Sequence, residues 1–388
     1  MLNNLRIKNF RMLEDLEIPK LGRVNLIVGK NNSGKSTLLE ALRIYAGNAN
    51  QNLLREILLG HDESFDLDGD TINESSEGSW FSLKNLFPNR ELPDSIEKSI
   101  IISTGNKEIL KVEFLLYRIN EELDTNEDGI TIGTIRRRVV VQLSEIESLE
   151  EGSEIIPAVR ITQQSGRINW IDLPSGIRRP SMTSRSFEDT SSVNCSFVST
   201  EFFSPDILAK LWDKITLSEY EKIVLSALKI IDGNVERLAF VEDRSRYPSR
   251  DLSRLSIVKM KNSDSRIPLN SMGDGMSRIL QLVLSVFPAK DGILLIDEFE
   301  NGLHYSVQEE VWKIIFKLAK ELNIQVFATT HSWDCIESFT KVAIESPEEG
   351  VLLKVSKSKL VSDNGKVIAT VYSEKELATI TATELEVR

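Results

Sequence analysis

The chain has 388 residues, 41% of them hydrophobic, and its 59 acidic and 47 basic side chains give a net charge of −12. This length is sufficient for two domains or for one large domain with an insertion, and the acidic balance argues against general binding of nucleic acid. The sequence has no run of 18 apolar residues, no apolar signal-peptide segment and only two cysteines. We therefore expect a cytoplasmic protein without a membrane span and without a zinc ribbon.

The first 46 residues predict the start of an α/β domain. Alternating apolar and polar residues over 2–18 predict a two-stranded hairpin, and the apolar stretch 23–28 predicts a short buried strand. A glycine-rich loop follows, and apolar residues at helical spacing over 36–45 predict a helix directly after the loop. Strand, loop and helix therefore follow one another without a gap.

The loop from Gly29 to Ser36 reads GKNNSGKS and fills every fixed position of the phosphate-binding motif GxxxxGK[ST]. Glycines let backbone N–H groups turn toward phosphates, and the N-terminus of the following helix favours an anion. We expect Lys35 to reach the β- and γ-phosphates of ATP and Ser36 to bind Mg²⁺. A chance glycine-rich turn is the plainer alternative. The predicted nucleotide-binding residues of this loop are Gly29, Asn31, Asn32, Ser33, Gly34, Lys35, Ser36 and Thr37.

The middle of the chain predicts an insertion between two halves of a core domain. Residues 47–106 are rich in polar residues and predict short helices and loops, whereas 108–175 contain several strand-like runs. Residues 174–193 predict an irregular loop, and 205–231 show helical periodicity. The expected segments are the N-terminal part of the core (1–46), an insertion with a β-rich lobe (47–193), a helical segment (194–254), the C-terminal part of the core (255–347) and an extension (348–388).

An acidic motif lies in the second half of the chain. The stretch Ile293–Glu298 (ILLIDE) predicts a buried strand that ends in two acids. At this end of the strand, Asp297 suits Mg²⁺ and Glu298 suits the removal of a proton from an attacking water. Many buried strands end in such a pair, so the motif is weak alone. Together with a complete phosphate loop it predicts hydrolysis of a nucleoside triphosphate.

Further motifs resemble the ABC-type ATPases, and within them the branch of RecF, SMC proteins and the overcoming-lysogenization-defect (OLD) nucleases. Ser271–Gly275 (SMGDG) lies where this family has its signature motif, and Thr329–Ser332 (TTHS) lies where it has its switch histidine. Asn9–Arg11 resembles the family's N-terminal NFR element. Glu300–His304 (ENGLH) lies at the D-loop and is most similar to OLD-type ATPases and their relatives in phage-defence systems.

The resemblance implies an α/β fold, namely an ABC-ATPase-type P-loop core with an inserted β-rich lobe and a helical segment. It also implies that Ser271 and Gly273 bind the γ-phosphate held by a second copy, that His331 senses the γ-phosphate, and that Arg11 approaches the nucleotide phosphates. Plainer alternatives are a helix N-cap for Ser271, a core histidine for His331 and a surface arginine for Arg11.

This chain departs from the family patterns at several places. Its signature is not the LSGGQ of transporters, which disfavours a transporter subunit. Phe299 and Tyr305 stand where the OLD pattern usually has proline, and neither Gln142 nor Gln163 is a convincing Q-loop glutamine. The acids at 66–70 do not form an EF-hand loop, because Thr71 stands where that loop needs glycine.

We expect an ATPase that uses ATP and Mg²⁺, with Lys35, Glu298 and His331 as catalytic residues and with two copies joined across the ATP sites. OLD nucleases carry a TOPRIM nuclease domain after the ATPase, and the roughly 40 residues after Pro347 are too few for one. A nuclease or other effector is therefore expected on a separate chain, in a bacterial anti-phage defence complex.

Two other roles stay open at this point. The first is a RecF-like DNA-repair or DNA-clamping ATPase, to which the arginines at 136–138 and at 178, 179 and 185 would offer a basic surface for nucleic acid. The second is a nucleotide-gated scaffold that hardly hydrolyses ATP, against which the presence of Glu298 argues.

Overall fold

The computed structural model divides the chain into two compact units. The core unit comprises Met1–Asn4, Ile18–Leu39 and Val193–Arg388, and the sheet unit comprises Leu5–Glu17 and Glu40–Ser192. The structure describes residues 1–63, 82–105, 107–125, 131–142, 155–173, 193–243, 253–261, 265–346, 349–363, 365–372, 376–377 and 379. The acids at 66–70, the expected loop at 174–193 apart from its last residue, and the arginines at 178, 179 and 185 therefore lie outside the described residues.

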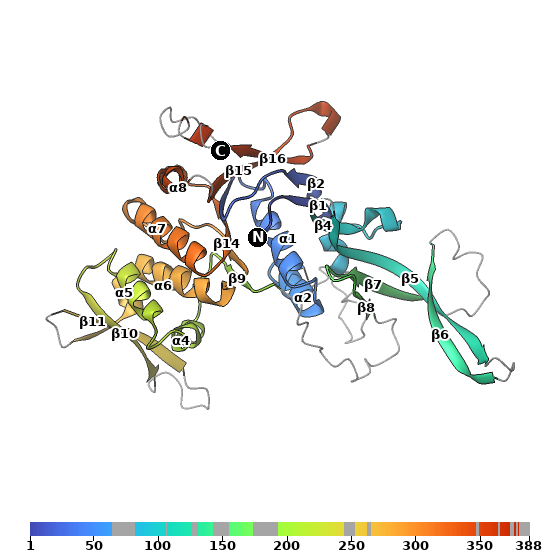
Figure 1. Cartoon of the computed structure of the whole chain (residues 1–388), viewed down its shortest axis with the longest axis horizontal. Coiled ribbons are helices and arrows are strands. Elements are labelled where there is room, and N and C mark those ends of the chain that lie inside the picture. Colours follow the sequence, from blue (N-terminus) through green and yellow to red (C-terminus); the bar gives the residue numbers. More distant parts are fainter. Residues whose placement is uncertain are drawn as a thin grey trace. The chain divides into compact units, whose positions relative to one another are not determined.

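A six-stranded sheet forms the centre of the core unit, in the order β16-β15-β3-β14-β13-β9 (Figure 1). All of its neighbours pair in parallel except β16, which is antiparallel to β15. The four central strands β3, β13, β14 and β15 are almost wholly buried, as strands covered on both faces must be. The strands are β3 (Val24–Val28), β9 (Cys195–Val198), β13 (Ile293–Ile296), β14 (Gln325–Thr330), β15 (Gly350–Lys357) and β16 (Val367–Tyr372).

Helices pack on this sheet through apolar residues at helical spacing. On α7, the buried residues Val311, Trp312, Ile315 and Phe316 lie on one side of the helix, while its lysines and glutamates remain outside. Almost all of α6 is buried, because it contacts α4, α5, α7 and β9. The helices of the core unit are α4 (Pro205–Asp213), α5 (Glu219–Leu228), α6 (Asp274–Val286), α7 (Tyr305–Glu321) and α8 (Trp333–Glu345), and α1 (Lys35–Ala46) begins in it.

A small antiparallel sheet, ordered β10-β11-β12, completes the core unit next to α4 and α5. Its strands are β10 (Val235–Asp243), β11 (Ser253–Met260) and β12 (Arg266–Pro268), and the 3₁₀ turn η5 (Leu269–Met272) leads from β12 to α6. The residues of the expected signature motif therefore directly follow this sheet in the chain. Two further 3₁₀ turns are η6 (Phe287–Ala289) and η7 (Val361–Asp363).

The sheet unit is built on a seven-stranded sheet ordered β2-β1-β4-β5-β7-β8, with β6 also paired to β5. Strand β5 is the longest of the described strands; its Tyr117 meets Trp170 edge to face with ring centroids 5.4 Å apart, and the guanidinium of Arg138 lies over both rings. The strands are β1 (Leu5–Phe10), β2 (Leu13–Ile18), β4 (Ile100–Thr104), β5 (Lys107–Thr125), β6 (Thr131–Val141), β7 (Ile156–Thr162) and β8 (Ile168–Asp172). The helical pieces are α2 (Gln51–Leu59), η1 (Ser82–Leu86), η2 (Pro88–Arg90) and η3 (Ile96–Lys98).

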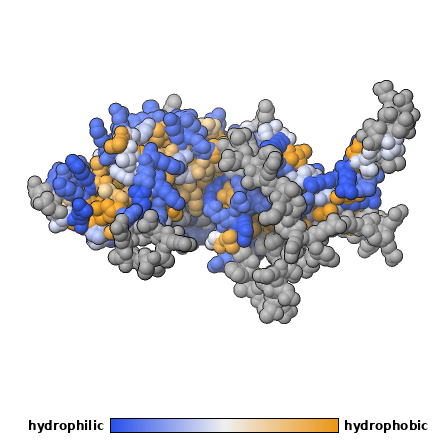
Figure 2. All heavy atoms as spheres, turned by 90° about the horizontal axis from the view of Figure 1, so that it is seen from below, coloured by the Kyte–Doolittle hydropathy of each residue, from blue (hydrophilic) through white to orange (hydrophobic). Residues whose placement is uncertain are grey.

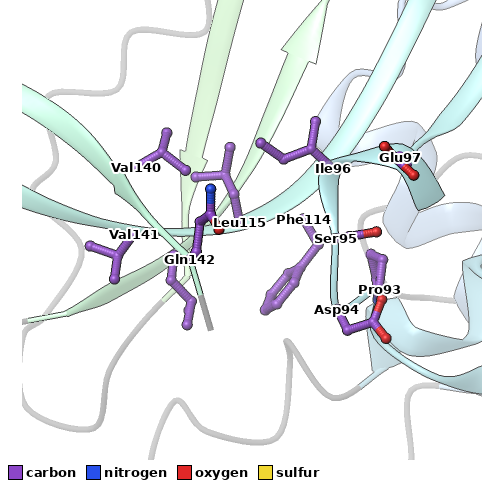
Figure 3. Close-up of a pocket in the computed structure, with 11 residues that line it drawn as sticks. Pro93, Asp94, Ser95, Ile96, Glu97, Phe114, Leu115, Val140, Val141 and Gln142 are labelled. Atoms are coloured by element: carbon purple, nitrogen blue, oxygen red, sulfur yellow. The ribbon is translucent and has the colours of Figure 1, made fainter. Parts of the chain in front are cut away.

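One edge of β5 has an interruption. Strands β4 and β6 both lie on the edge opposite β7, but β4 pairs up to Val112 and β6 pairs only from Leu116 onward. Neither strand pairs with the three residues between these two. A cavity of about 320 Å³ lies at this place, and the side chain of Phe114 points into it (Figure 3). All residues that line this cavity belong to the sheet unit.

The surface is mixed in character. On the face shown in Figure 2, hydrophobic and hydrophilic residues alternate over short distances. Single exposed apolar residues such as Leu217 and Val361 are normal on a folded protein. Among the described residues, no helix combines the length and apolar character that crossing a bilayer requires.

The α/β core with an inserted β-rich lobe is confirmed, but two expected segments differ from the structure. The segment 194–254 contains α4 and α5 as expected, yet it also supplies β9 and β10. Strand β9 has only four residues, too few to show a period. The expected extension 348–388 contributes β15 and β16 to the central sheet, because the apolar run of β15 pairs with β3. The hairpin over 2–18 and the strand-like runs expected within 108–175 are confirmed.

Candidate functional site

The phosphate loop connects the buried strand β3 to helix α1, as the sequence predicts. Helix α1 begins at Lys35, whose Nζ donates hydrogen bonds to the carbonyl oxygens of Gly29 (2.8 Å) and Lys30 (3.0 Å). Burial lowers the pKa of this ammonium group, while nearby acids, Asp297 foremost, oppose the shift. The lysine is therefore a half-desolvated cation held inside its own loop, which suits the binding of a phosphate.

Close packing requires glycine at the start of this loop. A Cβ atom at Gly29 would lie 2.2 Å from the carbonyl oxygen of Val355 on β15 and 2.6 Å from the Oγ of Ser33. Gly34 has φ of 102° and Asn32 has φ of 57°, so the chain turns through left-handed conformations. The buried Oγ of Ser33 has no hydrogen-bond partner among the described residues. The shape of this loop therefore comes from its backbone conformation, and the Oγ of Ser33 is available to accept or donate a hydrogen bond.

Ser36 and Asp297 meet although 261 residues separate them. The Oγ of Ser36 lies 3.2 and 3.3 Å from the two carboxylate oxygens of Asp297. The hydroxyl of Thr329 donates to the same carboxylate at 2.6 Å. Hydroxyl and carboxylate oxygens are the donors that Mg²⁺ prefers. Among the described residues, no cluster of three or more acidic, histidine or cysteine ligands is present.

Glu298 follows Asp297 at the end of β13 with an unusual backbone. Its φ is 48°, and its N–H donates to the Oγ1 of Thr329 at 2.9 Å. Its side chain is 43% exposed, so the carboxylate is open to a water molecule. Thr329 therefore contacts both acids at once. The sequence placed Thr329 in a motif without giving it a role, although its position opposite Asp297 follows from the register of β13 and β14.

A buried arginine on α6 holds the backbone on which these acids stand. Arg278 is fully buried and donates to the carbonyl oxygens of Ser199 (2.8 Å), Asp297 (3.0 Å) and Glu298 (2.9 Å). Burial lowers its pKa to about 10, and the attraction of Glu300 partly offsets that effect. Sequence reasoning missed this residue, because an arginine among the apolar positions of a helix gives no hint of its partners.

His331 lies at the end of β14, where the sequence predicts it, and not in the core, since its side chain is 53% exposed. Its Nδ1 is 3.7 Å from the Oε1 of Glu298 and 3.2 Å from the Oε1 of Glu300. The predicted histidine and the predicted base are therefore neighbours. Glu300 is an additional member of this group that sequence reasoning placed only within the D-loop pattern.

The expected signature residues lie at the start of α6. Ser271 is exposed in η5, and its hydroxyl donates to the carbonyl of Pro268 at 2.7 Å. Gly273 adopts φ of 94° immediately before α6, and a Cβ atom there would meet only open space. The hydroxyl of Ser271 does not cap the helix, which removes the plainer alternative for this residue. Binding to a nucleotide on another copy remains a prediction.

Arg11 belongs to the sheet unit. It has φ of 49°, and its guanidinium contacts the carboxylates of Glu40 (3.0 Å) and Glu63 (2.9 and 3.0 Å). These contacts show that it is not a simple surface arginine, since its side chain is only 13% exposed. Its approach to nucleotide phosphates remains a prediction.

Comparison with known families decides the class of this protein. The AAA ATPase domain family matches residues 1–129 and 182–336, which together are most of the chain. The chain belongs to this family. Its match includes the phosphate loop, the acids of β13, the D-loop and His331, so the family assignment rests on the same segments as the site. Nucleotide binding and ATP hydrolysis, as expected from the sequence, are confirmed at the level of the family.

Similar proteins agree with this AAA ATPase assignment. An ATP/GTP phosphatase of Helicobacter pylori is 24% identical over 383 residues, covering 89% of each chain. An OLD nuclease of Thermus scotoductus is 49% identical over 47 residues, which is 12% of this chain and 9% of that protein. The resemblance to the RecF, SMC and OLD branch of ABC-type P-loop ATPases is thereby confirmed.

Solved structures of SMC heads were also found. An SMC head bound to the C-winged helix domain of ScpA matches with 13% identity and a TM-score of 0.48, over 98% of this chain and 99% of the other. The SMC head domain from Thermotoga maritima matches with 14% identity and a TM-score of 0.40, over 96% and 99% of the two chains.

Proposed function

We propose that this ATPase binds Mg-ATP at a site completed by a second copy, and that the resulting dimer is a switch for a separately encoded effector. The observation that carries the proposal is the meeting of Ser36, Asp297, Glu298 and His331 beside the phosphate loop, while Ser271 and Gly273 stand exposed at the start of another helix. Such a division of groups suits a site shared between two copies.

The chemistry follows from the roles that these groups can take. Backbone N–H groups of the loop and Lys35 bind the phosphates, and Ser36 and Asp297 hold Mg²⁺, which would neutralise phosphate charge. Glu298 takes a proton from water as the water oxygen bonds to the γ-phosphorus. The bond from that phosphorus to the bridging oxygen breaks, and ADP leaves with the electron pair. His331 contacts the γ-phosphate and so reports its presence.

A second copy would supply Ser271 and Gly273 to the same γ-phosphate. The N-terminus of α6 follows them, and free N–H groups at a helix N-terminus favour an anion. Hydrolysis removes the group that both copies contact, so the dimer loses affinity after the reaction. Two states that differ in their contacts with a ligand are what a switch requires.

The defence role and the separate effector have more limited support. They rest on the ENGLH form of the D-loop and on the local similarity to an OLD nuclease. A DNA-clamping role finds less support, since Arg136 is paired with Glu121 and Arg138 with Asp172. These two arginines therefore belong to ion pairs within the sheet unit.

The test is the oligomeric state of Glu298→Gln by mass photometry, with and without Mg-ATP. Since the variant keeps the phosphate loop but lacks the base, we expect ATP binding without hydrolysis and a stable dimer, or multiples of it, only with ATP. Lys35→Ala is the control and should stay monomeric. A Glu298→Gln protein that binds ATP and remains monomeric would contradict the shared site. An oligomer of the same size with and without Mg-ATP would contradict assembly driven by the nucleotide.

A further inference from the structure

We propose that Glu300 is a positioning residue for His331, and that it keeps this histidine from pairing with the base Glu298. The inference rests on the proposed function, because it concerns the same site. It assigns a role to a residue whose side chain is only 10% exposed and which the catalytic scheme has not used.

The carboxylate of Glu300 holds the start of α8 by three contacts. Its Oε1 accepts hydrogen bonds from the backbone N–H of His331 (3.0 Å) and of Ser332 (3.1 Å), and it lies 3.2 Å from Nδ1 of the His331 ring. The N-cap residue Ser332 makes no capping bond with its own side chain. A carboxylate from another element therefore fixes the backbone immediately before α8, at His331 and at the N-cap residue Ser332.

Glu300 is itself held firmly in place. The preceding residue, Phe299, is buried and stacks on Trp312 of α7 with ring centroids 3.7 Å apart. The N–H of Phe299 donates to the carbonyl of Thr329 at 3.0 Å, and the carbonyl of Glu300 accepts from Leu303 at 2.8 Å. These contacts fix the backbone on both sides, so the carboxylate has a defined position relative to β14.

The short contact between Nδ1 of His331 and Glu300 favours one tautomer of the histidine. A carboxylate without its proton only accepts hydrogen bonds, so we assign the hydrogen of the neutral ring to Nδ1, which lies 3.2 Å from the Oε1 of Glu300. The second nitrogen, Nε2, then remains for the nucleotide side of the site. This arrangement of a histidine oriented by a carboxylate through its other nitrogen recurs wherever one ring nitrogen must be kept available.

Glu298 is the second acid beside this nitrogen: its Oε1 lies 3.7 Å from Nδ1, beyond hydrogen-bond distance but within reach of a small turn of the ring. Without Glu300, the ring would turn its hydrogen to Glu298 and occupy the carboxylate that must accept a proton from water. Loss of Glu300 therefore affects two groups at once: the histidine loses its orientation and the base becomes engaged. The expected effect is on the rate of hydrolysis and not on the binding of ATP.

The experiment combines kinetics with a double-mutant cycle on the full chain. Glu300→Ala should lower kcat about 10- to 100-fold, with the Kd for ATP changed by less than about 3-fold. Glu300→Gln keeps the size and one acceptor oxygen and should lie between Glu300→Ala and the wild type. The control, Glu310→Gln, alters an exposed acid of α7 and should leave kcat unchanged. In a His331→Ala background, Glu300→Ala should cause little further loss, because its target is absent.

Nuclear magnetic resonance gives an independent measurement. The chain has only three histidines, so the ¹⁵N signals of the His331 ring are assignable by substitution. We expect the Nδ1–H form in the wild type and its loss in Glu300→Ala. An Nε2–H form in the wild type, or equal losses of kcat from Glu300→Ala with and without His331, would overturn the proposal. If His331→Ala leaves kcat unchanged while Glu298→Gln abolishes it, the proposed role of His331 itself is wrong.

Discussion

Four side chains of the sheet unit form a small charged group, and their contacts determine the pKa of His61. His61 contacts Glu40, which also pairs with Arg11, and Arg11 in turn holds Glu63. The hydrogen bond to Glu40 is the main cause that raises the pKa of His61 above its ordinary value of 6.5, while burial opposes the shift. The protonated imidazole therefore stabilises the folded chain.

This shift predicts a pH-dependent contribution to stability. Since the folded-state pKa of His61 is raised, the contribution is complete below about pH 6.5 and disappears as the pH rises through the folded-state value. The ring is 45% exposed, so solvent screening limits the effect to less than about 1 kcal/mol. We expect His61→Gln to lower the free energy of unfolding in urea at pH 6 and to have little effect at pH 9. Equal effects at both values would show that Glu40 does not perturb this histidine.

At the scale of the element, the turn after β13 shows how a departure from a family pattern is accommodated. Phe299 stands where the OLD pattern usually has proline, and the structure gives this phenylalanine two roles. Its ring stacks on Trp312, which also packs against Phe339 of α8. Its N–H, which proline lacks, bonds to Thr329. The turn therefore depends on both the ring and the backbone donor.

Phe299→Pro should consequently destabilise the chain more than Phe299→Leu. Proline removes the N–H bond as well as the stack, and we expect a loss of about 3 kcal/mol or more. Leucine keeps the N–H and most of the apolar volume, and we expect a loss of about 1–2 kcal/mol. Unfolding in urea, followed by tryptophan fluorescence, measures both. Equal losses would mean that the hydrogen bond to Thr329 adds nothing to the stability of this turn.

The elements of the site differ in how far the sequence predicts them. The phosphate loop and the acids of β13 are local patterns, because neighbouring residues form each of them, and the structure brings Ser36 and Asp297 together as expected. Arg278, Thr329 and Glu300 act through contacts with residues on other elements, and no local pattern encodes those contacts. For the same reason β9 was not predicted: it is recognisable only by its pairing with β13.

At the scale of the whole molecule, the central sheet collects strands from both ends of the chain. Strand β3 near the N-terminus lies between β14 and β15 of the last quarter, so the phosphate loop and His331 follow adjacent strands. Ser271 and Gly273 lie in η5 and directly before α6, after the β10-β11-β12 sheet. The proposed function assigns both groups to one nucleotide through two copies arranged about a twofold axis.

Complementation between two inactive variants tests this arrangement directly. Lys35→Ala disables the phosphate loop of its own copy, and Ser271→Arg places a bulky cation where the partner's γ-phosphate would bind. In a mixed dimer, one site carries both defects, whereas the other combines an intact loop with an intact signature. Random mixing of equal amounts makes half of the dimers mixed, so we expect about a quarter of the wild-type ATPase activity from two proteins that are inactive alone.

Two further mixtures make the result specific to a shared site. Lys35→Ala mixed with Glu298→Gln should recover nothing, because both changes affect the half-site that carries the phosphate loop and every site then holds one of them. Wild-type protein mixed with the double variant Lys35→Ala/Ser271→Arg should lose activity, since each mixed dimer has one defect in each of its two sites. Suppose that the mixture of Lys35→Ala and Ser271→Arg stays inactive, while each variant still folds and Ser271→Arg still binds ATP. That result would place Ser271 outside the site. The phosphate loop and the acids of one copy would then have to act without a partner.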